Sequence, residues 1–173
     1  MRCYRVCDRR YPFLWATREQ PPGRWHDSGE GPCHYLATTP KGAWAEAVRH
    51  SGITDEDDLE DLELALWEVR VIPPVDVPTL DEATMTGGEW SYAACRAEAR
   101  RRRAAGSVGF VAPSAAVLSG RAEVYAVGTG GQYVTEHVPT GTIVLFGAPD
   151  DLVGIPSAEG HPDPTILDDV RSL

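Results

Sequence analysis

Residues 34–50, HYLATTPKGAWAEAVRH, predict a short strand that runs directly into a helix. The apolar run at the start is typical of a strand. Two threonines and then Pro40 mark the start of the helix, because a hydroxyl caps the first free amide groups and proline fits the first turn. Gly52 is a typical helix end. Glu46 is the exception in this helix, since its neighbours are nearly all apolar and predict extensive burial.

Strand-like and helical segments continue on both sides of this unit. Residues 3–7 precede it and residues 64–71 follow it, and both alternate as strands do. A second helix is predicted over residues 90–104, with arginines 100–103 in its last turn, where cations complement the helix dipole. Further short strands are predicted at residues 109–112, 123–127, 133–138 and 142–146. Strands and two helices without a regular βαβ alternation predict an α+β fold.

Length and charge limit the classes of protein. The 173 residues predict a single domain. Lysine and arginine number 16 and aspartate and glutamate 26, so the net charge of −10 repels phosphate backbones and argues against nucleic-acid binding. No apolar run approaches the ~20 residues of a membrane-spanning helix, and the N-terminus has no signal-peptide core. We therefore expect a cytoplasmic protein with no membrane partner.

Several familiar sites are absent from the sequence. There is no phosphate-binding G-x-x-x-x-G-K-[ST] loop and no G-x-S-x-G nucleophile. The four cysteines are too scattered for a disulfide framework or a zinc site, so we predict reduced thiols and no metal. The glycines of residues 128–131 predict a hairpin turn. Residues 55–63 hold seven of the 26 acids and predict a solvated loop between two elements.

Three polar side chains are candidates for the functional site, and each also has a structural interpretation. Arg24 lies between Gly23 and Trp25, where glycine lets the backbone approach a ligand and the guanidinium offers a planar fork for phosphate. The alternative is a surface arginine that lies on the tryptophan. Tyr35, taken alone, is a core aromatic. Ser114 follows a proline and, taken alone, caps a helix.

Fragments in a fixed order resemble the RES domain family, which is named for its arginine, glutamate and serine. They are Tyr4-Arg5, Gly23-Arg24-Trp25, Tyr35-Leu36-Ala37, Ala43-x-x-Glu46 and Gly109-Phe110-Val111-Ala112-Pro113-Ser114. The resemblance runs from about Met1 to Phe146 with order and spacing preserved. It implies a fold similar to ADP-ribosyltransferases, with a split, bent β-sheet and flanking helices. It also implies one catalytic domain over residues 1–146, and an acidic, proline-rich tail over 147–173 that packs on it or trails from it.

The resemblance also implies the site residues and the substrate. Catalytic roles fall on Glu46, Arg24, Tyr35 and Ser114, and NAD contacts on Arg5, Arg24, Trp25, Tyr35 and Ser114. NAD is then a substrate, and no cofactor is implied. Ser114 would hydrogen-bond the ligand or orient Glu46.

The chemistry agrees with these residue types. Breaking the bond between nicotinamide and ribose passes through an oxocarbenium-like state, which a carboxylate stabilises, and Glu46 is the only carboxylate among the motif residues. An aromatic face such as Tyr35 stacks on the nicotinamide cation. Arg24, and with it Arg5, would clamp the pyrophosphate. The structural alternative for Glu46 is a pairing with Arg49 or His50 on the same helix face.

Members of this family are typically the toxins of bacterial toxin–antitoxin pairs. The resemblance thus implies a NAD-consuming toxin with a cognate antitoxin that carries a helix-turn-helix DNA-binding domain. Hydrolysis or phosphorolysis of NAD is the first expectation, and an acidic segment 55–63 at the mouth of the site favours water slightly. Protein ADP-ribosylation at the same site is one alternative, and a non-catalytic binding module is another. His26 stands where the family usually has asparagine, which leaves its hydrogen bonds open.

Overall fold

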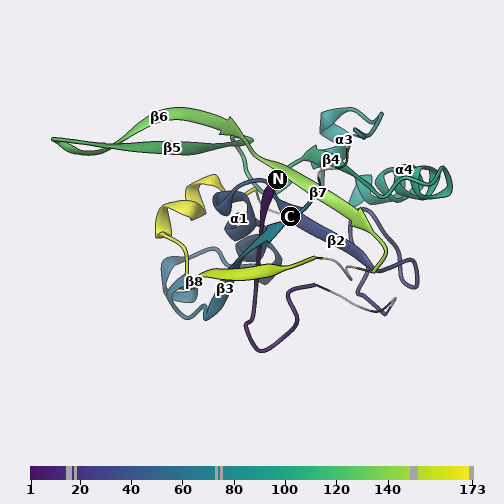
Figure 1. The fold of residues 1–173 in the computed structure, drawn as a ribbon, viewed down its shortest axis with the longest axis horizontal. Coiled ribbons are helices and arrows are strands. Elements are labelled where there is room, and N and C mark those ends of the chain that lie inside the picture. The colour runs from purple at the N-terminus through teal and green to yellow at the C-terminus, as the bar shows by residue number, and fades with distance from the viewer. Residues whose placement is uncertain (15–16, 18, 73, 75, 149–151, 172–173) are drawn as a thin grey trace.

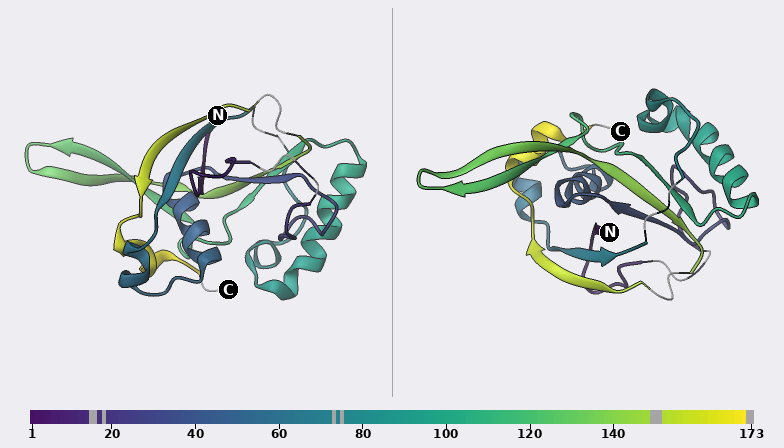
Figure 2. Two further views of the ribbon diagram at one scale, coloured as in Figure 1. Left: turned by 90° about the horizontal axis from the view of Figure 1, so that it is seen from below. Right: turned by 45° about the horizontal axis from the view of Figure 1, so that its top comes forward.

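A split antiparallel sheet forms the centre of the molecule (Figure 1). The computed structural model describes residues 1–14, 17, 19–72, 74, 76–148 and 152–171. In the order β4-β7-β2-β1-β3-β8, the strands are β4 (Gly109–Pro113), β7 (Gly141–Phe146), β2 (Cys33–Ala37), β1 (Arg2–Cys7), β3 (Leu64–Arg70) and β8 (Gly154–Gly160). Only one register pair, Tyr4 with Ala37, joins β1 to β2, whereas six pairs join β1 to β3. The sheet is therefore bent and divided into the halves β4-β7-β2 and β1-β3-β8 (Figure 2).

Helices cover the two halves separately. They are α1 (Pro40–Ser51), α2 (Glu56–Glu60), α3 (Glu82–Thr86), α4 (Tyr92–Ala104) and the 3₁₀ helices η1 (Glu89–Ser91) and η2 (Pro164–Asp169). α1 packs in a core with Leu66 and Ile166, and α3 and α4 pack in a second core around Phe110. These elements confirm the α+β fold with flanking helices. None of the helices in the described part of the chain is long and apolar enough to cross a membrane.

The helix α1 begins and ends where the sequence predicts. The Thr39 side chain accepts a hydrogen bond from the amide of Gly42 at 3.1 Å, and Pro40 occupies the first turn. Gly52 ends the helix with a φ of 68°, a left-handed conformation that glycine adopts without strain. The capping residues thus fix the position of this helix, and with it the direction in which Glu46 points.

The acidic segment differs from its prediction. Residues 55–63, expected to form a solvated loop, contain α2, and Leu59 in this helix is fully buried in the core beside α1. The Asp55 side chain caps the helix by accepting from the amide of Asp58 at 2.9 Å. Three acids in the first turn also interact favourably with the positive end of the helix dipole. The run of acids is therefore the solvated face of a short helix that one leucine anchors.

The segment after Gly147 continues the fold. β8 adds an edge strand beside β3, and Ile166 in η2 is buried in the core under α1. The backbone amide of Arg171 donates to the carbonyl of Ala116 at 2.7 Å. Residues 149–151 and 172–173 of the predicted tail lie outside the described residues. The sheet and the core therefore both extend past the predicted domain boundary at residue 146.

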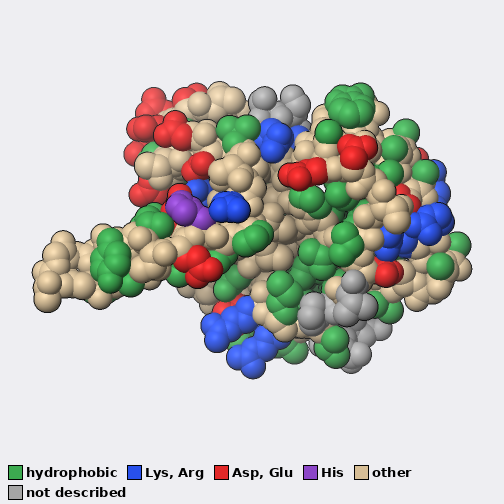
Figure 3. Space-filling model, turned by 90° about the horizontal axis from the view of Figure 1, so that it is seen from above, with side chains coloured by type: hydrophobic (Ala, Val, Ile, Leu, Met, Phe, Trp, Pro, Cys, Tyr) green, Lys and Arg blue, Asp and Glu red, His purple; other side chains and the backbone are tan. Residues whose placement is uncertain are grey.

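A hairpin projects from one end of the molecule (Figures 1 and 3). It consists of β5 (Arg121–Gly128) and β6 (Gly131–Pro139), which pair only with each other among the described strands. The predicted turn at residues 128–131 is confirmed, because Gly128 pairs with Gly131. Residues 124–135 of the hairpin contain no charged side chain, in a chain of which 24% is charged. Its tip is thus a neutral arm on an acidic protein.

Candidate active site

Tyr35 lies at the centre of the sheet face that the helices cover. Its neighbours two positions away on β2, Cys33 and Ala37, point to the same face because side chains alternate along a strand. Cys33 belongs to the core beside α4, and Ala37 belongs to the core beside α1. The half-buried Tyr35 therefore lies between the two helical layers, one with α1 and one with α3 and α4, which cover different halves of the sheet (Figure 2).

The Tyr35 hydroxyl is held by a network that we call the Tyr35 network, consisting of Trp25, His26 and Tyr35. The hydroxyl accepts from the backbone amide of Trp25 at 3.0 Å and lies 2.8 Å from Nδ1 of His26. Nε2 of His26 lies 2.9 Å from the carbonyl of Pro21, and because a carbonyl only accepts, Nε2 carries the proton. Burial lowers the pKa of His26, so the ring is neutral at pH 7 and Nδ1 accepts from the Tyr35 hydroxyl.

The same network explains why residue 23 is a glycine and which hydrogen bonds His26 makes. A Cβ on Gly23 would lie 2.8 Å from the Tyr35 hydroxyl oxygen, so any larger residue would displace the ring. The amide of Gly23 donates to the carbonyl of His26 at 3.0 Å and closes the loop. His26 is 1% exposed and uses both ring nitrogens. In place of the expected asparagine, this histidine fixes the orientation of the tyrosine ring.

Arg24 is bound by the protein itself. Nη1 donates to the Ser91 hydroxyl at 3.0 Å and Nη2 to the carbonyl of Gly87 at 2.6 Å. The guanidinium also lies over the ring of Tyr92, 4.7 Å from its centre. The adjacent Trp25 is 2% exposed and packs edge-on against Phe110. Both side chains of this motif therefore tie the loop to α3, η1, α4 and β4.

Arg5 bridges the split in the sheet. It lies on β1, and its Nη1 donates to the carbonyl of Tyr35 on β2 at 3.2 Å. Burial lowers the pKa of this guanidinium, and its Nε is buried without a hydrogen-bond partner in the described part of the chain. Arg5 thus supports the backbone of Tyr35 near the single Tyr4–Ala37 pair that joins the two halves.

Glu46 is a half-buried carboxylate on a largely apolar helix. It points from α1, and its Oε2 lies 3.6 Å from Nε2 of His50, one turn further on. Burial raises the pKa of Glu46, while the positive charges of His50, Arg49 and Arg24 act in the opposite direction. Arg24 is bonded to Gly87 and Ser91, next to α3 and in η1, so its charge reaches Glu46 from outside α1. Glu46 therefore has both the structural partner His50 and further positive charges that act on its carboxylate.

Ser114 is placed by its own loop. It is 3% exposed, its amide donates to the carbonyl of Thr140 at 3.1 Å, and its hydroxyl accepts from the amide of Ala116 at 3.3 Å. No hydrogen bond to Glu46 is present among the described residues. The Ser114 hydroxyl therefore caps the backbone, but it caps a turn and not the helix that the sequence predicts.

Comparison with known proteins identifies the family. The statistical model of the RES domain matches residues 2–162. The chain belongs to the RES domain family. A search of curated proteins finds no match. Among solved structures, the crystal structure of the M. tuberculosis MbcT–MbcA toxin–antitoxin complex contains a similar chain, with 17% identity, a TM-score of 0.61, and coverage of 96% of this chain and 86% of that one.

Arg49 is a buried residue of this RES domain that the sequence motifs miss. It follows Glu46 by three positions on α1, is 5% exposed, and donates from Nη1 to the carbonyl of Ala115 at 2.6 Å. Burial lowers its pKa, and the positive charges of Arg24 and Arg171 act in the same direction. Its position on the same helix face as Glu46 was the only available signal, because the loop it contacts is 66 residues away in sequence.

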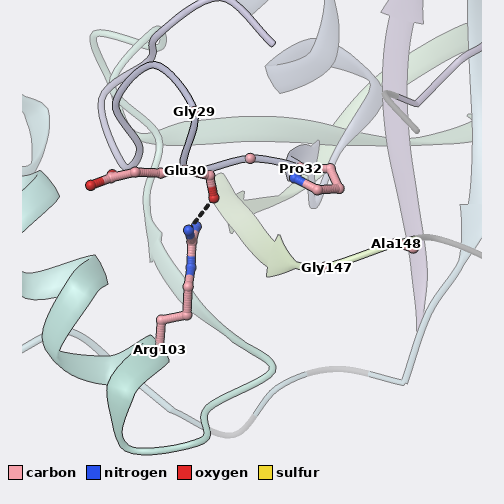
Figure 4. Close-up of a pocket in the computed structure, with 7 residues that line it drawn as sticks. Gly29, Glu30, Pro32, Arg103, Gly147 and Ala148 are labelled. Carbon is pink, nitrogen blue, oxygen red and sulfur yellow. Dashed lines mark hydrogen bonds between the residues drawn. The ribbon is translucent and has the colours of Figure 1, made fainter. Parts of the chain in front are cut away.

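A pocket elsewhere in the RES domain is separate from this site. It has a volume of about 550 Å³, and Arg103 reaches across it to donate to the carbonyl of Glu30 (Figure 4). Its described lining residues are Gly29, Glu30, Gly31, Pro32, Arg103, Gly147 and Ala148, which include none of the predicted site residues. Over the described residues, no group of three or more histidine, cysteine, aspartate or glutamate side chains is arranged to hold a metal ion.

Proposed function

We propose that this RES domain cleaves the bond between nicotinamide and ribose in NAD, with water or phosphate as the acceptor. The observation that carries the proposal is Glu46, a half-buried carboxylate on a largely apolar helix, on which the positive charge of Arg24 also acts. As the bond breaks, positive charge develops on the ribose ring, and a preorganised carboxylate in surroundings of low dielectric stabilises it.

The remaining motif residues orient the substrate or hold the surrounding elements in place. Tyr35 presents its ring between the two helical layers, and its fixed hydroxyl prevents the ring from turning away from a bound nicotinamide. Arg5 fixes the backbone of Tyr35, and Trp25 supports the loop from within the core. Ser114 shapes the turn that lies beside Arg49. In this account Arg24 acts on the site through its charge and through the position of α3, η1 and α4.

Water is the acceptor we favour. The acidic helix α2 shares a core with α1, the helix that carries Glu46, and its carboxylates lower the local concentration of phosphate. The solvent-facing part of α2 contains no aromatic or arginine anchor of the kind that docks a protein acceptor. Protein ADP-ribosylation is thus the second candidate, with the same site and a different acceptor.

We further propose that the protein is the toxin of a toxin–antitoxin pair, in the cytoplasm. Uncontrolled NAD loss would harm the producing cell, so a partner that blocks the site is expected. The structurally similar MbcT–MbcA complex contains an antitoxin, and the net charge of −10 favours a partner with a basic contact surface. We expect that partner to carry a helix-turn-helix domain. Expression of this chain alone should deplete cellular NAD, and co-expression with the neighbouring gene should restore growth.

The proposed reaction is tested with NAD labelled in its adenylate half. Purified protein is incubated with and without phosphate, and with and without cell lysate, and the labelled products are separated. We expect release of nicotinamide without any lysate, and label in free ADP-ribose or, with phosphate, its 1″-phosphate. Label that moves only onto a lysate protein would favour the transferase. NAD that stays intact under every condition would leave a binding module with this fold.

A further inference from the structure

Two arginines that are far apart in the sequence meet at one turn. Arg49 of α1 donates from Nη1 to the carbonyl of Ala115, and Arg171, close to the C-terminus, donates from its backbone amide to the carbonyl of Ala116. A bridge between Val117 and Val170 continues the contact. Both residues bind adjacent carbonyls of this turn, and the positive charge of Arg171 contributes to the lowered pKa of Arg49, so the two side chains are neighbours. We call Arg49 and Arg171 the arginine pair.

The arginine pair has hydrogen-bonding capacity that the protein leaves unused. The Nε atom of each guanidinium is buried and has no hydrogen-bond partner among the residues that the structure describes. Arg49 is 5% exposed, so its charge is almost wholly removed from bulk water. A buried guanidinium with free donors is unfavourable unless an anion completes its surroundings.

The charges around the pair leave a positive surplus. The other charged groups that act on Arg49 are Glu46 on the same helix and Arg24. Three arginines then stand against one carboxylate, which leaves two positive charges. This surplus lies in a protein whose net charge is −10, so it is a local arrangement and not a consequence of composition. A ligand with two negative charges would balance it.

The other arginines near the site are placed differently. Both terminal nitrogens of Arg24 donate to protein oxygens. Arg5 also has a buried Nε without a partner in the described chain, but it lies on β1, where its Nη1 donates to the carbonyl of Tyr35. Arg49, in contrast, lies one helical turn from Glu46, a distance of ~5 Å along the axis. That spacing suits a ribose whose anomeric carbon is at the carboxylate and whose 5′ oxygen leads to a phosphate.

We propose that the arginine pair forms the subsite for the pyrophosphate of NAD. This proposal rests on the proposed function for the identity of the ligand, but the subsite itself is defined by its anion chemistry. Two guanidinium groups offer charge-assisted hydrogen bonds to the two phosphates, and the bound dianion neutralises the local surplus. The family model ends at residue 162, so Arg171 is a contribution of this chain outside the matched motifs.

The test measures binding of inorganic pyrophosphate by calorimetry. The variants are Arg171→Ala, which keeps the backbone bond to Ala116, and Arg49→Met, which keeps the apolar stem. Arg70→Ala is the matched control, because Arg70 is exposed on β3 and its removal changes the net charge equally. We expect pyrophosphate to bind the wild type and Arg70→Ala, and to bind each pair variant at least ~10-fold more weakly. Thermal melting verifies that each variant is folded.

The outcomes separate this proposal from the proposed function. Selective loss of pyrophosphate binding in Arg171→Ala supports the subsite, even if the protein never cleaves NAD and even if Arg49→Met does not fold. If the wild type does not bind pyrophosphate, or if folded Arg171→Ala binds it as tightly as Arg70→Ala, the subsite is wrong. In that case unchanged nicotinamide release with an unchanged KM for NAD would leave the proposed function standing.

Discussion

The Tyr35 network and the arginine pair are two polar groups of the same site, and they differ in how fully the protein satisfies their hydrogen bonds. In the Tyr35 network the hydroxyl of Tyr35 and both ring nitrogens of His26 have partners within 3.0 Å. In the arginine pair, Arg49 and Arg171 each retain a buried Nε without a partner in the described chain. Completed polar groups rigidify a structure, whereas incomplete buried charges are stable only if something binds them. The first group therefore holds the Tyr35 ring in a fixed position, and the second is where we expect the phosphates of the ligand.

The largest expected effect comes from the carboxylate of Glu46. Glu46→Gln removes the charge that stabilises the oxocarbenium-like state but keeps the shape, so kcat for nicotinamide release should fall by ~10²-fold or more. Glu60→Gln is the matched control, because Glu60 is exposed on α2 and loses the same charge. Steady-state nicotinamide release and thermal melting are measured on both. Turnover by Glu46→Gln close to that of the control would remove Glu46 from the reaction.

The pH profile of the wild type gives an independent check of the same residue. Since burial raises the pKa of Glu46, its reactive ionised form is lost at a higher pH than for an ordinary glutamate. We expect kcat to fall on the acid side at a pH above the ordinary value of about 4.5. A flat profile down to that pH would mean that the ionisation of Glu46 does not limit the reaction.

A smaller effect is expected at Arg24, and it tests whether this side chain supports the structure or binds the ligand. Lysine cannot hold both Gly87 and Ser91 and lie over Tyr92, so Arg24→Lys should lower the free energy of unfolding by about 2 kcal/mol. Its KM for NAD should change less than that of Arg171→Ala. Arg121→Lys, on the exposed start of β5, serves as the control for denaturant unfolding. Unchanged stability with much weaker NAD binding would restore Arg24 as the phosphate clamp expected from the sequence.

The smallest expected effect is a pH dependence within the Tyr35 network. Because burial lowers the pKa of His26, the unfolded chain takes up a proton at a pH where the folded protein resists it. The stability from this neutral histidine is present above about pH 6.5 and is lost as the pH falls towards the lowered folded value. His26→Asn should therefore flatten the acid-side decline in unfolding free energy by up to about 1 kcal/mol.

The measurement is denaturant unfolding at pH values of about 7.5 and 5.5. His137→Asn, on the exposed strand β6, is the control. Part of the decline should persist in His26→Asn, because burial also lowers the pKa of His34. A decline in His26→Asn as steep as in the control would show that His26 is not the group that resists protonation.

Local signals in the sequence were sufficient for much of the fold. The helix α1 was predictable because its caps, Thr39 and Gly52, are adjacent to its ends. α2 was missed because a run of acids resembles a solvated loop, and only the tertiary burial of Leu59 distinguishes the two. β8 was missed because an exposed edge strand, GIPSAEG, needs no apolar alternation.

The site was predictable in its residues but not in their contacts. Family motifs indicated Glu46 and Tyr35, and the structure places both on elements that face the region between the helical layers. The bonds of Arg24 to Gly87 and Ser91 span more than 60 residues of sequence, and no local pattern encodes them. Arg171 was not predictable for the same reason, because it is far from Arg49 in the sequence and becomes its neighbour only in the folded chain.

A crystal structure of the Glu46→Gln variant with NAD tests the central claim most directly, because that variant should bind the substrate without consuming it. We predict the anomeric carbon beside residue 46, the nicotinamide against the ring of Tyr35, and phosphate oxygens within ~3.5 Å of Arg49 and Arg171. NAD bound in the pocket beside Arg103, or with its phosphates held by Arg24 and not by the arginine pair, would contradict the account.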